Sequence, residues 1–147
     1  MIQGNRASLI VHSDVRTVSE ISALLGLEPD RWGESGEVVM HRRGRPDVSR
    51  RRPYPHSFWA SETITREPAS EDQTGFAALR KLVDLLEPCA DALAELRQDG
   101  ETIIWWSGDS DSTQGGFVLE ADLLRRAAIL GCDIYGTTYL SEDADDG

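Results

Sequence analysis

The chain is poor in the residues that most often build chemical sites. Its 147 residues include two cysteines and three histidines, and no two histidines have the spacing of metal ligands. There is no G-x-S-x-G nucleophile motif and no glycine-rich phosphate loop ahead of a helix. Cys89 and Cys132 lie in apolar contexts and are interpreted as reduced core residues. These scarcities argue against an enzyme, and we expect no catalytic residue, no metal and no cofactor.

Long apolar runs are also missing. No stretch approaches the roughly 18 consecutive apolar residues of a membrane-spanning helix. The first residues, Met1 to Arg6, are polar, unlike the apolar region of a signal peptide. We therefore expect a cytoplasmic protein without a membrane segment, and the length fits one domain with a real core.

Positive charge is scarce outside one segment. The formal net charge is −11, yet six arginines and a single acid, Asp47, lie between His41 and His56, so that segment carries about +5 and the remainder about −16. Such an acidic remainder repels nucleic-acid phosphates and attracts basic proteins. We expect a basic protein partner and no specific nucleic acid, although the charge also fits solubility alone.

The basic segment, residues 42–55, combines its arginines with three prolines. Guanidinium groups seldom bury without partners, and proline disrupts regular elements, so an exposed loop is expected. Opposite charge should hold this loop across an acidic surface, either of its own chain or of a second copy in a homodimer.

Periodicity predicts the secondary structure. Alternating apolar and polar residues predict strands at Ala7–Ser13, Glu37–His41, Ser57–Thr65, Thr102–Trp106, Gly116–Leu119 and Asp133–Leu140. Apolar stripes predict three helices. Thr17 and Glu20 form a capping box for the first, which Gly26 ends. The second runs from a capping pattern at Ser70 to Leu96 and should bend or split at Pro88, and the third covers Ala121–Leu130.

This order indicates an α+β two-layer sandwich with a mostly antiparallel sheet: a ferredoxin-like β-α-β-β-α-β core and an added β-α-β unit. Residues 1–140 form the single predicted domain, and the acidic tail 141–147 is expected to be disordered. All strands should share one sheet, through Leu9, Val39, Trp59, Ile104, Phe117 and Ile134. The predicted helices should pack on it through Leu24, Leu82 and Leu124.

Five stretches, in this order, carry a family resemblance: A-S-L-I-V-H-S-D, L-L-G-L-E-P-D-R, S-F-W-A-S, L-E-P-C-A-D-A-L-A-E-L and G-G-F-V-L-E-A-D-L-L-R-R-A-A-I-L-G-C-D-I. Together they resemble the bacterial domain of unknown function 4279 family, from roughly Ala7 to Tyr139. The resemblance implies a small single-domain cytoplasmic protein and, since the family has no established activity, no catalytic residues. The loop 42–55 is longer and more basic than the family pattern.

One loop has the oxygen-ligand spacing of a calcium site. Asp109, Asp111, Thr113 and Glu120 occupy the first, third, fifth and twelfth positions of such a loop. However, Gln114 stands where the sharp turn requires glycine, and a strand rather than a helix precedes it. A polar hairpin loop is the preferred interpretation, and no tightly bound calcium is expected.

His12 is a second candidate. In His12-Ser13-Asp14 a base could act beside a carboxylate. A lone histidine on a strand is more often packed or solvated.

The tryptophans are the most informative candidates for binding. Trp105 and Trp106 must point to opposite faces of their strand. If helices cover the face of Ile104 and Trp106, Trp105 lies on the open face with Trp59 and with Tyr135 or Tyr139. Exposed aromatic patches serve recognition of partners or small ligands. Alternatively, a loop or the added unit covers them.

We therefore expect a non-catalytic protein-binding module that uses its sheet face, through Trp59, Trp105, Tyr135, Tyr139 and His12. One concrete version is an immunity-type partner of a basic toxin. The alternative is a small-ligand-binding or regulatory domain with an aromatic pocket on the sheet.

Overall fold

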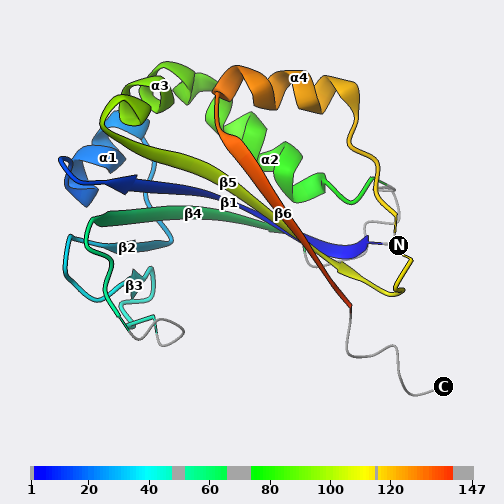
Figure 1. The fold of residues 1–147 in the computed structure, drawn as a ribbon, viewed down its shortest axis with the longest axis horizontal. Coiled ribbons are helices and arrows are strands. Elements are labelled where there is room, and N and C mark those ends of the chain that lie inside the picture. The colour runs from blue at the N-terminus through cyan, green and yellow to red at the C-terminus, as the bar shows by residue number, and fades with distance from the viewer. Residues whose placement is uncertain (1, 48–51, 66–73, 115, 141–147) are drawn as a thin grey trace.

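The computed structural model describes residues 2–47, 52–65, 74–114 and 116–140. One mixed six-stranded sheet, in the order β3-β2-β4-β1-β5-β6, carries all helices on one face (Figure 1). The strands are β1 (Ile2–Ser13), β2 (Arg31–Gly33), β3 (Met40–His41), β4 (Ser57–Thr65), β5 (Gly100–Ser110) and β6 (Asp133–Leu140). The helices are α1 (Val18–Leu25), α2 (Ala77–Leu86), the 3₁₀ turn η1 (Glu87–Cys89), α3 (Ala90–Asp99) and α4 (Ala121–Leu130). The predicted α+β class is confirmed.

The central strand β1 sets which residues face the helices. It pairs antiparallel with β4 on one side and with β5 on the other. Ala7, Leu9 and Val11 all face the helices and are fully buried. Their spacing of two residues along the strand predicts that they share one face. Residues opposite one another in a ladder share a face, so the Leu9–Ile104 pair puts Ile104 in the same core.

Local signals position the helices. Thr17 caps α1 by accepting from the Glu20 amide while the Glu20 carboxylate accepts from the Thr17 amide, so the predicted capping box is confirmed. Gly26 ends the helix in the left-handed region, at φ 68°. Pro88 lies in η1 and splits the second predicted helix into α2 and α3, also as predicted. The predicted start at Ser70 lies outside the described residues.

The region between α1 and β4 differs from the prediction. A short strand at Arg31–Gly33 was not predicted, and the strand predicted at Glu37–His41 is reduced to Met40–His41. A turn ends at Gly36, with φ 78°, and Glu37, the first residue of the predicted strand, lies in a bend. Val39 therefore lies just outside β3, although it is buried. In addition, β1 begins at Ile2, before the predicted Ala7.

The predicted strand Gly116–Leu119 is wrong, and α4 and β6 alone form the added unit. Phe117 packs edge-on against Phe76 at 5.3 Å between ring centroids, and the Val118 amide donates to Thr74 O at 3.0 Å. These contacts draw the chain toward the helix layer, and β6 takes the place beside β5. The prediction for Leu124 is wrong too: Leu123 faces the core, whereas Leu124 is 48% exposed.

Two smaller predictions concern the charged segments. Arg42, Arg43, Arg45 and Arg52 are exposed as predicted, and Arg42 pairs with Asp30 at 3.4 Å, but Asp47 in the same segment is buried. Residues 48–51 and the predicted disordered tail 141–147 lie outside the described residues.

In the part of the chain that the structure describes, no helix combines the length and apolarity needed to cross a membrane.

Both cysteines belong to the helix-side core. Cys89 and Cys132 are buried free thiols, and burial raises the pKa of Cys89 above its usual value. A thiol with a raised pKa carries little thiolate near neutral pH, which favours a packing role.

Candidate functional site

A groove of about 740 Å³ occupies the sheet face opposite the helices. Its floor comes from β1, β4, β5 and β6, and its wall from β2, β3 and the segments around Asp47 and Tyr54. We call it the open-face groove. Its lining residues include Arg6, Arg31, Asp47, Phe58, Trp105 and Tyr139.

Aromatic rings from β5 and β6 form one end of the open-face groove. Trp105 pairs with Tyr135 in the parallel ladder, and their rings stack at 5.1 Å with an interplanar angle of 23°. Trp105 is 42% exposed, and Tyr139, two pleats further along β6, is 58% exposed. Trp105 therefore lies on the open face, as predicted for a sheet whose other face is covered by helices, and both Tyr135 and Tyr139 lie there with it, although only Trp105 and Tyr139 line the groove.

A second aromatic group lies at the other end. Tyr54 and Phe58 stack at 4.8 Å, and both line the open-face groove. His12 packs behind them, 5.1 Å from Tyr54 and 4.3 Å from His56 between ring centroids. His12 is thus part of the aromatic wall of this face but does not line the groove itself.

The charged groups of the open-face groove occur in opposite pairs. Asp47, a buried carboxylate, lies 3.6 Å from Arg31 Nη1 and 3.6 Å from His41 Nε2. The Arg31 guanidinium also lies over the Phe58 ring, 5.6 Å from its centroid. Across the floor, Arg6 Nε pairs with Glu62 at 3.1 Å. This pairing leaves the aromatic rings as the most distinctive exposed groups of the groove.

Trp59 does not lie on the open face, contrary to the prediction. It is fully buried in the helix-side core, and its Nε1 donates to Ser22 Oγ on α1 at 2.9 Å. Its ladder partner on β1 is Val11, which faces the helices, so Trp59 must face them as well. Phe58 takes the open-face position instead.

The sequence His12-Ser13-Asp14 does not assemble a base and a nucleophile. Ser13 is on the helix side of β1, whereas His12 is on the open side. Ser13 Oγ accepts from the amides of Val15 and Arg16, at 3.3 and 3.0 Å, which shapes the turn into α1. Asp14 is exposed. The serine is therefore engaged in holding the turn.

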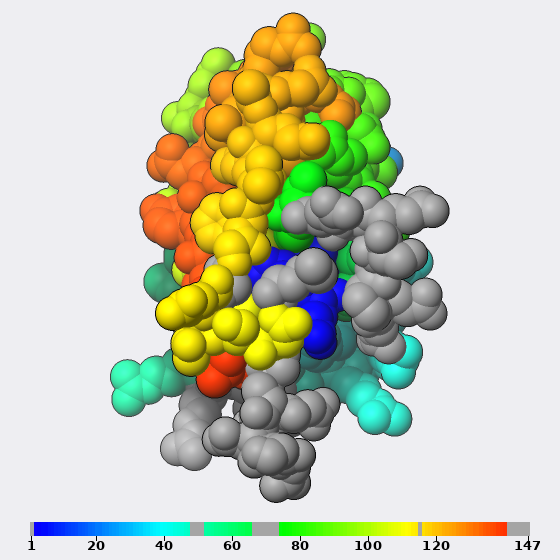
Figure 2. Space-filling model, turned by 90° about the vertical axis from the view of Figure 1, so that its right-hand side faces the viewer, coloured from blue at the N-terminus to red at the C-terminus, as the bar shows by residue number. Residues whose placement is uncertain are grey.

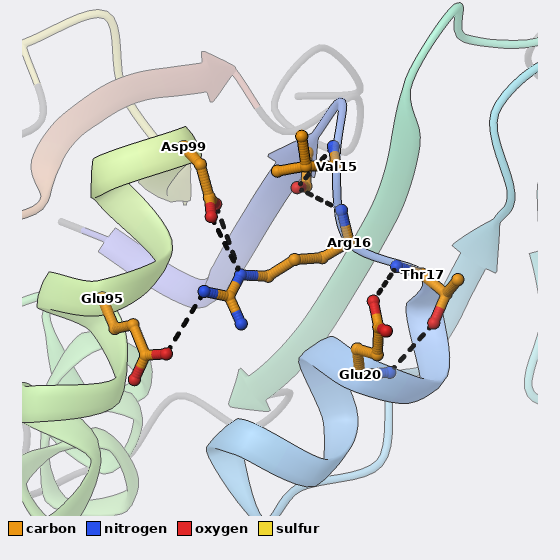
Figure 3. A network of polar contacts seen from close by, with 7 residues as sticks. Val15, Arg16, Thr17, Glu20, Glu95 and Asp99 are labelled. Atoms are coloured by element: carbon orange, nitrogen blue, oxygen red, sulfur yellow. Dashed lines mark hydrogen bonds and ion pairs between the residues drawn. The ribbon is translucent and has the colours of Figure 1, made fainter.

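The same turn is fixed to α3 by Arg16. Figure 3 shows its guanidinium reaching Asp99 at 3.3 Å and Glu95 at 3.2 Å, beside the Thr17–Glu20 capping box. The hydrogen bond to Asp99, with help from Glu95, raises the pKa of Arg16 above its ordinary value. This network joins α1 to α3 at the surface and lies away from the open-face groove.

The calcium-like spacing does not form a loop around an ion. β5 continues through Ser110, so Asp109 lies in a strand, and Glu120 pairs with Arg80 of α2. Within residues 2–47, 52–65, 74–114 and 116–140, no group of three or more histidine, cysteine, aspartate or glutamate side chains could hold a metal ion.

Several groove residues were not predicted. Arg31 lies in the unpredicted strand β2, and Asp47 was treated as part of an exposed loop. Phe58 could have been found: it alternates with Trp59, so one of the two had to occupy the open face. Choosing between them required the register of β4 on β1.

Comparison with known families gives one match. The family described as Domain of unknown function (DUF4279) matches residues 3–141, nearly the whole chain and all six strands except the first residue of β1. Neither the curated proteins nor the solved structures include a match to this chain.

Proposed function

Because the chain belongs to the family Domain of unknown function (DUF4279), whose description states no activity, we propose a function from the groove: a non-catalytic, cytoplasmic protein-binding module. In this proposal the open-face groove receives an extended segment of another protein. Specific nucleic-acid binding is not part of it.

The observation that supports this proposal is the combination of exposed rings and paired charges. Trp105 and Tyr139 expose large aromatic surface, while the neighbouring ions Arg31–Asp47 and Arg6–Glu62 already have partners. Tryptophan and tyrosine are enriched among the residues that contribute most binding energy at protein interfaces. A partner side chain can therefore gain aromatic contact here without leaving a groove charge unpaired.

The net charge of −11 supports a basic partner. Long-range attraction accelerates the encounter of oppositely charged proteins and weakens as salt is added. An immunity-type protein that binds a basic toxin is one concrete version of this proposal.

A second candidate is a small-ligand-binding or regulatory domain. The volume of about 740 Å³ favours it, because small-molecule pockets in proteins span roughly 300–1,000 Å³. The stacked Trp105–Tyr135 pair would then serve as a platform for a planar ligand.

We also propose that the core is ferredoxin-like. The strands β2-β4-β1-β5 are neighbours in that order, with antiparallel pairing at each step, and α1 and α2–α3 provide the two crossovers. In this assignment β2, rather than the predicted strand near Val39, is the second core strand.

Peptide selection tests the binding proposal. Peptides selected from a random displayed library on the full chain should be rich in basic and aromatic residues. Their affinity, measured by calorimetry, should fall about tenfold or more for Trp105→Ala and for Tyr139→Ser, as for anchor residues of interfaces. Ile129→Ser, which removes an exposed apolar side chain from α4, is the matched control and should bind normally.

Two outcomes would contradict the proposal. Unchanged affinity in both groove variants would place binding elsewhere, and acidic selected peptides would exclude the basic partner. A planar small molecule that raises the melting temperature of the wild type but not of Trp105→Ala would favour the second candidate.

A further inference from the structure

The outer side of β6 is an open edge of the sheet. β6 pairs with β5 through its whole length, Asp133–Leu140, and is last in the strand order. Figure 1 looks onto this strand, drawn in orange-red, and the described residues place no strand on its outer side. Alternate residues of an edge strand direct unpaired amide and carbonyl groups outward, which allows pairing with another strand.

The features that usually protect an edge are absent from β6 after its first residue, Asp133. From Ile134 to Leu140 it has no charged residue and no proline, and its register with β5 has no bulge. The opposite edge, β3, is only two residues long and is followed by exposed arginines. Short strands discourage edge pairing, whereas a long and regular edge with an uncharged interior permits it.

The sequence of β6 is nearly symmetric about Thr137. Residues equidistant from Thr137 match in character: Ile134 with Leu140, Tyr135 with Tyr139, and the small Gly136 with Thr138. An antiparallel pair centred on Thr137 would place each residue opposite its counterpart. Aromatic and aliphatic cross-strand pairs of this kind stabilise antiparallel ladders.

We propose that the partner of this edge is a second copy of the chain, paired β6 to β6 in antiparallel orientation about a two-fold axis at Thr137. Such an axis is perpendicular to the sheet, so the open faces of both copies lie on one side and the helices on the other. Tyr135 of each copy then lies opposite Tyr139 of the other on the open side. Ile134 and Leu140 meet on the helix side.

The helix above this edge fits the same arrangement. Figure 2 shows α4, in orange, next to the upper part of β6, in orange-red. Arg126 pairs with Glu87 at 2.6 Å and with Asp84, so that side of α4 faces α2 and η1. At 100° per residue, Leu124 and the exposed Ala128 lie on the side away from α2. They form a small apolar stripe, which would contact the same stripe on the second copy.

The charge distribution gives the association a characteristic salt dependence. Two chains of net charge −11 repel one another, but Ile134–Leu140 is uncharged, so the contact buries no ion. Salt screens the repulsion between the two chains but does not weaken the uncharged β6–β6 contact. The dimer should therefore become more stable as salt is added. The proposed basic partner should show the opposite trend, which keeps this inference separate from the proposed function.

Opposite charges at the axis test the pairing and its register together. Thr137→Lys and Thr137→Glu each place like charges opposite one another across the two-fold axis, so each variant alone should dimerise on the order of tenfold more weakly than the wild type. An equimolar mixture of the two should recover the dimer, because the substituted residues then pair with opposite charge. Thr113→Lys and Thr113→Glu, at an exposed position off the strand, are the matched controls and should dimerise like the wild type.

Molar mass from sedimentation, measured over a range of protein and salt concentrations, reports the dimer. Amide exchange adds an independent readout, since outward amides of β6 should gain protection only at high protein concentration. Circular dichroism verifies that each variant is folded. A wild type that stays monomeric, folded variants that dimerise normally, or a mixture that fails to recover the dimer would each overturn the proposal.

Discussion

Trp105 and Trp106 are neighbours in sequence on opposite faces of the sheet, and they differ in almost every contact. Trp106 is 3% exposed, stacks on Phe76 at 4.5 Å, and donates from Nε1 to Gly75 O at 3.1 Å. Trp105 is 42% exposed, and its stacking partner is the exposed Tyr135. The same side chain is thus part of the core on one face and available for contact on the other.

The polar groups on the two faces of the sheet also differ in their surroundings. On the helix face, the indole of Trp59 has a single buried donor, and Ser22 accepts from it. On the open face, full charges remain, and they occur in pairs near water, such as Arg6 with Glu62. Substitutions on the helix face should therefore lower stability, whereas those on the open face should mainly change binding.

The largest expected effect comes from comparing the two neighbouring tryptophans. Trp106→Ala should lower the free energy of unfolding by about 3–5 kcal/mol, because it removes a buried ring and leaves a cavity. Trp105→Ala should cost less than about 1 kcal/mol, as for an exposed site. Denaturant unfolding of both variants gives the two values. Equal losses would mean that the two faces are not energetically distinct.

Ser22→Ala tests the polar contact inside the core. The substitution leaves the buried Trp59 Nε1 without its acceptor, and an unsatisfied buried donor costs about 1–3 kcal/mol. Ser19→Ala, at an exposed position on the same helix, is the control and should change stability little. The same unfolding assay applies, and a neutral Ser22→Ala would show that the indole finds another acceptor.

Asp47→Asn tests the more buried ion pair of the open face. It removes the charge that faces Arg31 and His41, each at 3.6 Å, and we expect a loss of about 1 kcal/mol, near the upper end for partly exposed pairs. Thermal melting at neutral pH measures it. A loss as large as that of Trp106→Ala would make this face part of the structural core.

The smallest effect is expected for Arg6 and Glu62. Their side chains are 57% and 25% exposed, and exposed pairs contribute roughly 0–1 kcal/mol. A double-mutant cycle with Arg6→Gln and Glu62→Gln should give a coupling free energy within this range that decreases with added salt. A coupling unaffected by salt would contradict an exposed, solvent-screened pair.

Local rules predicted the helix ends well. The Thr17–Glu20 capping box, the left-handed Gly26 and the break at Pro88 depend on a few adjacent residues, and all three are confirmed. The strand Ser57–Thr65 was also predicted with its observed bounds, from local sequence alone. Such features need no knowledge of distant residues.

The sequence-based predictions were wrong where contacts with residues distant in the sequence determine the structure. The face of the sheet on which Trp59 lies follows from its pairing with Val11. The path of the chain around Phe117 follows from the contact of Phe117 with Phe76. On α4, Leu123 and Leu124 are adjacent leucines, and only packing against α2 and α3 selects the first for the core. Strand β2 has three residues, too few for any periodicity. Trp105, Tyr135 and Tyr139 were placed correctly because alternation along each strand was sufficient.

The central position of β1 also has a consequence for how the chain is made. β1 is synthesised before both of its neighbours, β4 and β5, which begin at Ser57 and Gly100. Protein synthesis proceeds at roughly 5–20 residues per second. The apolar side of β1 therefore stays unpacked for seconds before both neighbouring strands have been made. Pairings between such distant segments also fold slowly. The nascent chain is therefore exposed to misassembly and to chaperones until β5 has been translated.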